Sequence, residues 1–352
     1  MQTVKRVFLV GNGFNYLVAN IIKSHDGTGL SKRVVDAKDA CINNIEFLTR
    51  LWERFDEAFA ELKKEAKGLN EEELIGLVQC VINFLSCLEG LVENVDISQI
   101  QKLLGTLFDK FLVQKVIEIA QDFRRHENIE EYKHIKQYFK IIPYEIESFI
   151  KSNPQCLFNL YTTNYDGILE TVFAKERREG VSGFLGEDGF IRKISENPVR
   201  LALDRTRLEN QKIKFLHLHG SYKFAKNFGM TCKILGNTQN NNPVMVFNRP
   251  EHKGNLVRGD DVLNTYFEKL RRDLSTCDKF IILGNSMRNE PHIKELLRDS
   301  IRSEATIVVC SRNPKEIKDQ IKSFVRCKIE EESTQSITSE VDLIDFLIKV
   351  LS

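Results

Sequence analysis

The sequence predicts an α/β fold: an open, mainly parallel sheet whose first strand is separated from the others by a large, all-helical insert. Two observations lead to this prediction. Short apolar and β-branched runs recur along the chain, and each main run is apolar on both faces, as strands buried between two helical layers require. Between the first run and the second, about 110 residues show helical spacing and no strand signal.

The first predicted strand covers residues 4–10 and stops at a glycine turn. The later strands are expected at 157–161, 213–218, 279–283 and 305–310, with a weaker one at 325–329. Helical spacing predicts helices over 261–275, 291–303 and 341–351. The stretch 223–243 is rich in Asn, Gly and Lys and is expected to form a mobile loop.

The insert is assigned to residues 36–151, and the α/β domain to residues 1–35 and 152–352. Aromatic residues recur in the insert three and four positions apart, at Trp52, Phe55 and Phe59 and again at Phe108 and Phe111. A stripe with this spacing lies on one face of a helix, and we expect it mainly to form core.

The charge balance argues against nucleic acid as a direct partner. The 352 residues include 51 Lys and Arg and 50 Asp and Glu, a formal net charge of +1. A dedicated nucleic-acid binder usually carries a marked basic excess.

The eight cysteines contain no C-x-x-C pair. This spacing excludes the usual zinc ribbon or knuckle, and we expect reduced, mostly buried thiols. The N-terminus lacks the apolar core of a signal peptide, and no apolar stretch is long enough to span a bilayer. We therefore expect a cytoplasmic protein with no membrane partner.

Two predicted strands end in similar glycine turns, Gly11-Asn12-Gly13-Phe14 and Gly284-Asn285-Ser286. Such turns let the backbone approach a phosphate, and the N-terminus of the following helix supplies N–H donors. Tyr16 breaks the six-residue dinucleotide fingerprint, so a plain strand-to-helix turn stays an alternative for the first cluster.

A second polar cluster contains Thr163, Asn164 and Asp166, directly after a predicted strand. Hydroxyl, amide and carboxylate groups here suit recognition of a ribose and an amide. The alternative is an N-cap, because Thr, Asn and Asp also begin helices well.

A third cluster, His217-Leu218-His219-Gly220-Ser221, ends another strand. On a strand both histidines would face the same way, unless the strand ends before His219. His219 is placed to act as a general base, whereas a structural role is favoured for His217. Paired histidines also ligate metals, but no Asp, Glu or Cys at short spacing completes a set, so we expect no metal.

A fifth strand end carries Asn313. Its position suits a hydrogen-bonding rim for an adenosine, although a simple turn explains it equally well.

In order, Gly-Asn-Gly-Phe, Thr-Thr-Asn-Tyr-Asp, Leu-His-Gly-Ser and Leu-Gly-Asn-Ser after successive strands resemble the sirtuin family, particularly the sirtuin-like NADases of bacterial antiphage defence. The likeness covers about residues 1–22 and 155–330 and implies a Rossmann-like, sirtuin-type sheet. A second similarity is with bacterial abortive-infection proteins beginning Gly-Asn-Gly-Phe-Asp, where this chain has Asn15.

The resemblance implies NAD as substrate. Gly11, Asn12, Gly13 and Phe14 match the pyrophosphate turn. Thr163, Asn164 and Asp166 match the surroundings of the nicotinamide ribose, and His219 matches the general base. Gly284, Asn285 and Ser286 match phosphate and ribose contacts, and Asn313 an adenosine-side contact. The Ala-Ser pair and Pro-x-Phe-Arg segment that many sirtuins have after the first turn are missing.

The resemblance thus implies an NAD⁺ glycohydrolase that releases nicotinamide and ADP-ribose as a regulated effector of antiphage defence by abortive infection. The four-cysteine zinc module of protein-deacylating sirtuins is absent from the sequence, which argues against the nearest alternative, an NAD-dependent protein deacylase. A non-catalytic NAD or ADP-ribose sensor or assembly subunit is a further alternative. Regulation implies a homo-oligomer or a partner defence subunit, and the helical insert is the expected contact.

Overall fold

The computed structural model describes residues 4–23, 135–173, 188–196, 198–210, 213–235, 242–247 and 250–352. It also describes helical residues 76, 78–82, 105, 112–114 and 116–125. Most of the predicted insert, including its five aromatic residues, lies outside these ranges. The prediction that it is all-helical and the domain boundaries at 36 and 151 therefore stay predictions.

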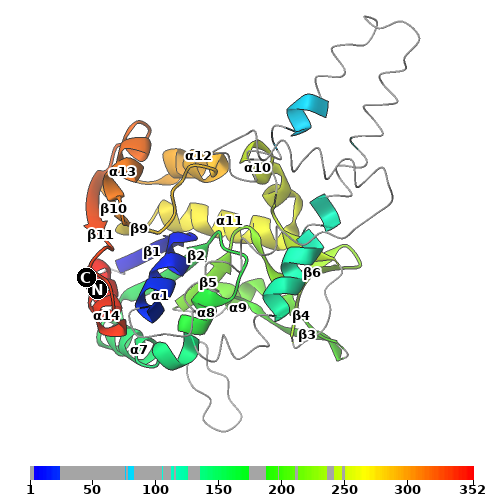
Figure 1. Cartoon of the computed structure of the whole chain (residues 1–352), viewed down its shortest axis with the longest axis horizontal. Helices are drawn as coiled ribbons and strands as arrows, with labels where there is room; N and C mark the ends of the chain where they lie inside the picture. The colour runs from blue at the N-terminus through cyan, green and yellow to red at the C-terminus, as the bar shows by residue number, and fades with distance from the viewer. Residues whose placement is uncertain are drawn as a thin grey trace, which may run out of the picture.

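The main sheet has six strands, all parallel, in the order β11-β10-β9-β1-β2-β5. The strands are β1 (Val4–Val10), β2 (Cys156–Thr162), β5 (Ile213–His217), β9 (Lys279–Leu283), β10 (Thr306–Ser311) and β11 (Lys328–Ser333). The predicted open parallel sheet is confirmed, and β1 lies at its centre between β2 and β9 (Figure 1).

Helices cover both faces of this sheet. One layer consists of α1 (Gly13–Lys23), α7 (Ile142–Ser152), α8 (Ile168–Val172) and α14 (Glu340–Leu351). The other consists of α10 (Pro250–Gly259), α11 (Asp261–Leu274), α12 (Pro291–Ser300) and α13 (Pro314–Lys322). The predicted helices over 261–275, 291–303 and 341–351 correspond to α11, α12 and α14.

The strand sequences explain the two layers. Along β1, Phe8 and Val10 pack with the α1 layer, whereas Val7 and Leu9 pack with the α11 layer. Because side chains alternate between the faces of a strand, the part of β1 that is covered on both sides, residues 7–10, is apolar at successive positions. Helix α7, at the end of the predicted insert, joins the same core through Ile142, Ile146 and Ile150.

A second, antiparallel sheet corrects the prediction of a loop over 223–243. Its strand order is β3-β4-β7-β6-β8. The strands are β3 (Phe190–Glu196), β4 (Val199–Leu203), β6 (Gly220–Asn227), β7 (Met230–Ile234) and β8 (Pro243–Met245). Short strands with polar or charged positions give a weak strand signal, so the Asn, Gly and Lys content was misleading. Helix α9 (Arg205–Asn210) follows β4.

The weak strand expected at 325–329 was also placed wrongly, because the last strand of the main sheet is Lys328–Ser333. This strand is at the edge of the sheet, and three of its six residues are glutamates. Charged residues are common on edge strands because they discourage pairing with other chains, and they hide the apolar signal.

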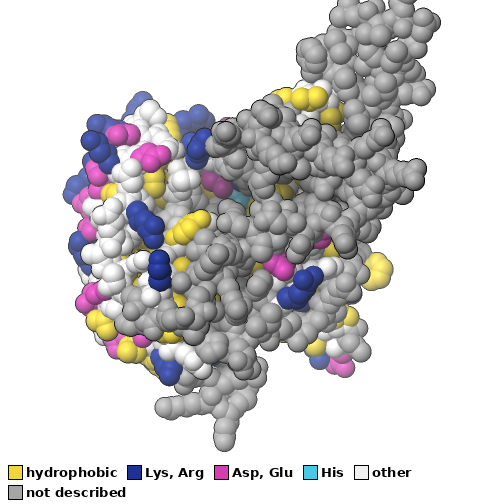
Figure 2. Space-filling model, viewed as in Figure 1, with side chains coloured by type: hydrophobic (Ala, Val, Ile, Leu, Met, Phe, Trp, Pro, Cys, Tyr) yellow, Lys and Arg dark blue, Asp and Glu magenta, His cyan; other side chains and the backbone are white. Residues whose placement is uncertain are grey.

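Acidic and basic side chains alternate along the margin of the molecule that holds β11, α13 and α14 (Figure 2). Lys318 pairs there with Glu331, and Lys349 with Glu332. Among the residues that the structure describes, no helix is long and apolar enough to cross a membrane.

Candidate functional site

The turns after β1 and β9 pack against each other, backbone to backbone. The Gly13 N–H donates to the Gly284 carbonyl oxygen at 2.7 Å. A Cβ on Gly13 would lie 2.6 Å from Gly284 Cα, and a Cβ on Gly11 would lie 2.7 Å from Asn285 Cα. Gly284 has a φ of +63°, a left-handed conformation that favours glycine. These glycines are therefore required by the contact between the turns, whatever ligand they also approach.

Asn15, in the first turn of α1, joins the first and second polar clusters. Its Nδ2 donates to Asp166 Oδ2 at 2.8 Å, and its Oδ1 accepts from Asn164 Nδ2 at 3.3 Å. All three side chains are buried. Asn15 thus fixes the orientation of the Asn164 amide.

Asp166 has a hydrogen-bond donor on each carboxylate oxygen. Oδ2 accepts from Asn15, and Oδ1 accepts from the Ile168 N–H at 2.9 Å, at the start of α8. Burial raises the pKa of Asp166 above its ordinary value, while the two hydrogen bonds act in the opposite direction. The N-cap alternative for this cluster is wrong, because the N-cap of α8 is Gly167 and no side chain caps the helix. Asp166 accepts from the first N–H of the helix and orients Asn15.

His217 is the last residue of β5 and belongs to a buried ion pair. Its Nε2 lies 2.8 Å from Glu170 Oε1, and its Nδ1 donates to the Asn164 carbonyl oxygen at 2.9 Å. Burial alone would lower the pKa of His217, but the Glu170 carboxylate outweighs it and the pKa is raised. Burial disfavours ionised Glu170, yet His217 brings its pKa down to about 2. The pair is therefore an imidazolium and a carboxylate, with both ring N–H groups used.

His219 lies beyond the end of β5, in the turn that leads to β6. Its carbonyl oxygen accepts from the Val246 N–H at 2.7 Å, and Tyr165 donates its hydroxyl to the Val246 carbonyl at 2.5 Å. Gly220 has a φ of +82°, and any Cβ there would collide with the Val244 carbonyl oxygen. The antiparallel sheet therefore holds His219 in place, and the two histidines do not share partners.

The imidazole of His219 faces the start of α12. His219 Nε2 lies 2.9 Å from His292 Nε2 and 3.3 Å from Glu290 Oε2. Burial holds the pKa of His219 well below its usual range, with contributions from Lys253 and His292. Burial likewise lowers the pKa of His292 to about 3, together with Lys253 and Arg258. Both rings are therefore neutral near neutral pH.

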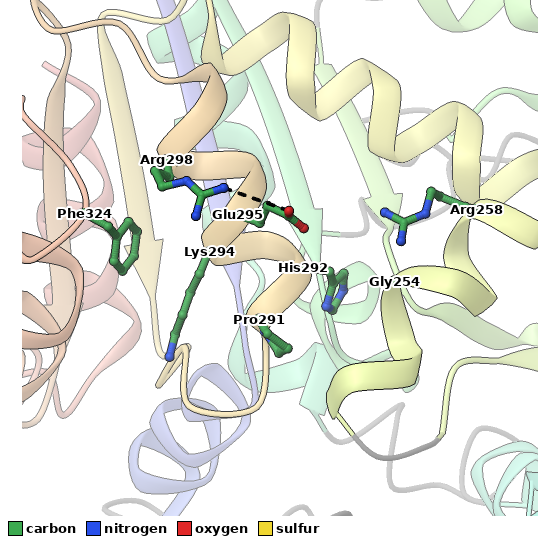
Figure 3. A pocket seen from close by; sticks show the side chains of 8 residues that line it. All are labelled: Gly254, Arg258, Pro291, His292, Lys294, Glu295, Arg298 and Phe324. Atoms are coloured by element: carbon green, nitrogen blue, oxygen red, sulfur yellow. Dashed lines mark ion pairs between the residues drawn. The ribbon is translucent and has the colours of Figure 1, made fainter.

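His292 projects from the first turn of α12 toward α10, where Gly254 allows the two helices to approach (Figure 3). A cavity of about 440 Å³ lies along α12. Its lining consists of Gly254, Arg258, Pro291, His292, Lys294, Glu295, Arg298 and Phe324. Within this lining Arg298 pairs with Glu295, and it also pairs with the neighbouring Asp299.

The structure brings most predicted site residues to the C-terminal ends of adjacent strands. Within one connected group, Asn285 Nδ2 donates to Thr163 Oγ1 at 3.0 Å. The predicted residues in this group are Gly11, Asn12, Gly13, Phe14, Thr163, Asn164, Asp166, Gly284 and Asn285. His219 lies at the end of β5, near the ring of Tyr165. Ser286 is exposed beside the β9 turn.

Asn313 is also exposed and lies at the end of β10, where its Nδ2 donates to Glu316 Oε2 at 3.4 Å. In the part of the chain that the structure describes, no hydrogen bond joins it to the other predicted residues.

Sequence reasoning missed Asn15, Glu290 and His292 as site residues. Asn15 follows Phe14 directly and belongs to the same polar cluster as the first glycine turn, but no site role was predicted for its amide. Glu290-Pro291-His292 follows the Gly284-Asn285-Ser286 turn closely, and Glu and His are both residue types that ligate zinc. Short-range spacing around His217 and His219 does not reveal this group, because the residues that meet His219 are more than 70 positions away in the sequence.

The profile of a family described as SIR2-like domain matches residues 159–331, which include Asn164, His219 and Asn285. The match supports a sirtuin-like family for this part of the chain and, with it, NAD-related chemistry. SIR2-like domains use NAD as a substrate, and the six-stranded parallel sheet is consistent with their Rossmann-like fold. No curated protein matches the chain.

Proposed function

We propose that this protein is an NAD⁺ glycohydrolase that cleaves NAD⁺ to nicotinamide and ADP-ribose. The proposal rests mainly on His219, which is buried and neutral. It lies at the sheet edge formed by the C-terminal ends of the strands, where the Asn164 amide is also held in a fixed orientation. Both residues are within the segment that matches SIR2-like domains.

The edge formed by the C-terminal ends of β1, β2, β5 and β9 is where open α/β sheets bind their ligands. The pyrophosphate would lie beside the Gly11–Gly13 turn, at the positive end of the α1 helix dipole. The N–H groups of Gly13 and Phe14 already have backbone partners, so the dipole and not free N–H groups would attract the phosphates. Asn285 and Ser286 extend the same edge and would contact phosphate and ribose, with Asn313 at the adenosine end.

The reaction breaks the bond between the ribose anomeric carbon and the nicotinamide nitrogen, and nicotinamide leaves with the bonding electron pair. Water adds to the anomeric carbon, and its proton must be removed. The transition state has oxocarbenium character, so the protein must mainly orient the ribose and admit one water.

His219 is assigned the general base, because a neutral imidazole can take the proton from the water or from a ribose hydroxyl. We assign Asn164 the role of positioning the ribose or the attacking water, because its amide is held by Asn15. Asp166 acts as a positioning residue by orienting Asn15 and balances positive charge that develops on the ribose.

The biological role that we propose is a regulated effector of antiphage defence that acts by abortive infection. Uncontrolled NAD cleavage would harm the host cell, so such an enzyme requires control by oligomerisation or by a partner subunit. The predicted helical insert is the region that we assign to that contact. Light scattering after size exclusion tests it, and a strict monomer that co-purifies with no partner would contradict it.

The experiment is chromatographic detection of products after NAD⁺ is added to the purified chain, alone and with the proteins encoded beside it. We expect nicotinamide and ADP-ribose to accumulate in equal amounts, and His219→Ala and Asn164→Ala to lose this activity. Retention of full NAD consumption by both variants would refute the assignment. O-acyl-ADP-ribose formed from an acyl-lysine peptide would instead indicate a deacylase, and binding without nicotinamide release would indicate a sensor.

A further inference from the structure

Three buried side chains with metal-ligating atoms converge between the β5–β6 turn and the start of α12: His219, Glu290 and His292. Their facing atoms are His219 Nε2, His292 Nε2 and Glu290 Oε2. The separations are 2.9 Å between the two nitrogens, 3.3 Å from His219 to Glu290 and 3.8 Å from His292 to Glu290.

Hydrogen bonds among the three side chains do not use all of the lone pairs that meet here. With both imidazoles neutral, one Nε2–H can lie between the two rings, and it leaves lone pairs of the carboxylate and the other ring directed at the same space. His292 Nδ1 is also buried and has no hydrogen-bond partner in the described part of the chain. A single cation at the centre would accept a lone pair from all three atoms.

The geometry suits zinc. Bonds of about 2.0–2.1 Å to nitrogen and oxygen in a tetrahedral site place the ligand atoms about 3.3 Å apart. The three observed separations bracket this value. The second carboxylate oxygen of Glu290 faces Lys253, with Oε1 3.4 Å from Nζ, which leaves Oε2 directed at the histidines. Outer contacts of this kind orient ligands in metal sites.

We propose that His219, Glu290 and His292 form a binding site for one zinc ion, with a fourth position open to water. The site is distinct from a four-cysteine module and uses residues from β5–β6 and α12.

Zinc at this site has a consequence that rests on the proposed function. The metal would occupy the Nε2 lone pair of His219 and lower the basicity of the ring, so the zinc-loaded chain should cleave NAD more slowly than the zinc-free chain. Zinc would then act as an inhibitor of the base that we assign.

The direct test is zinc binding by the full chain after dialysis against a chelator, measured by competition with a chromophoric chelator and by elemental mass spectrometry. We expect one zinc ion per chain. Glu290→Gln and His292→Ala should weaken zinc affinity by at least about 100-fold, the upper end of what the loss of an outer-shell partner costs. His252→Ala is the matched control, because this exposed histidine of α10 is outside the cluster, and it should bind zinc as the wild type does.

Cobalt substitution separates this site from cysteine ligation and does not depend on any variant folding. A cobalt spectrum with tetrahedral ligand-field bands and no sulfur charge-transfer band supports the proposal. A strong sulfur band, no saturable binding, or unchanged affinity in folded Glu290→Gln and His292→Ala would overturn it. These readouts need no NAD, so zinc binding by a chain that never cleaves NAD would refute only the proposed function.

Discussion

His217 and His219 are two residues apart, yet their surroundings make the first ring a cation and leave the second neutral. The ring of His217 lies between a carboxylate and a backbone carbonyl, and its pKa is raised. The Nε2 of His219 lies 2.9 Å from that of His292, and burial lowers the pKa of His219, with contributions from Lys253 and His292. Both side chains are almost fully buried, so the partners, and not exposure, cause the difference.

The comparison separates a structural role from a chemical one. A protonated imidazole with both N–H groups bonded can position Asn164 but cannot accept a proton. A neutral imidazole retains a lone pair for a substrate proton or a metal. The same distinction between a structural and a chemical role applies to Gly13 and Asn15. Each variant below tests which of the two roles a residue has.

Replacement of His217 should have the largest effect on stability. His217→Ala leaves the Glu170 carboxylate buried without its cation, and we expect the free energy of unfolding to fall by about 3–5 kcal/mol. Urea denaturation measures this. The double variant His217→Ala/Glu170→Gln should regain part of the loss because the buried charge is gone. A cost below about 1 kcal/mol for His217→Ala would contradict the structural role.

Acid titration tests the same ion pair. The pKa of Glu170 is about 2 in the folded chain, below its ordinary value of 4.5, and His217 and Lys223 are the cations that lower it against burial. The resulting stability is complete above about pH 4.5 and is lost as the pH falls toward 2, an effect of the order of 3 kcal/mol.

The difference in unfolding free energy between the wild type and Glu170→Gln should therefore shift against the wild type as the pH falls from about 4.5 toward 2. Above about pH 5 the difference also includes the titration of His217, because Glu170 raises the pKa of that ring. Urea denaturation at each pH provides the values. A difference that stays constant down to about pH 3 would mean that the pair does not hold Glu170 ionised.

Gly13→Ala tests whether the first glycine turn is needed for packing. The added Cβ meets the backbone of Gly284, which cannot give way as a flexible side chain can, and we expect a loss of about 1–3 kcal/mol without any ligand. Gly259→Ala is the control, since its Cβ would meet nothing within 4 Å. Unchanged stability with weaker NAD binding would assign Gly13 to the ligand alone.

Asn15→Ala should have the smallest effect on stability, about 1–2 kcal/mol, because it removes hydrogen bonds and no charge. It should slow NAD cleavage by more than this loss of stability explains, since Asn164 loses its orientation. Asn20→Ala in the same helix, which removes one bond to the Ile337 carbonyl, is the control. Equal cleavage rates for the two variants would remove Asn15 from the site.

The sequence was a good guide where structure follows from local pattern. The strands at 4–10 and 279–283 were placed correctly because burial on two sides makes residues 7–10 and 280–283 apolar on both faces. The second sheet was missed, because its strands are short and partly exposed. For instance, the alternation of apolar and polar residues in β7 is weak at Met230, Thr231 and Cys232. It does not outweigh the loop signal of the surrounding Asn and Gly residues.

The site followed the same rule. Clusters local in sequence, such as Thr163–Asp166, could be recognised before their partners were known. The meeting of His219 with His292 depends on how α12 packs against α10, which no short pattern records. The assignment of charge to His217 and neutrality to His219 likewise required their partners.

The most direct measurement of the central claim is the rate of nicotinamide release from NAD⁺ by the wild type, His219→Ala and the control His252→Ala, at matched folding by circular dichroism. The account predicts equal rates for the wild type and His252→Ala, and a rate lower by about 10²–10⁴-fold for His219→Ala. Nicotinamide release by His219→Ala at the wild-type rate would contradict it.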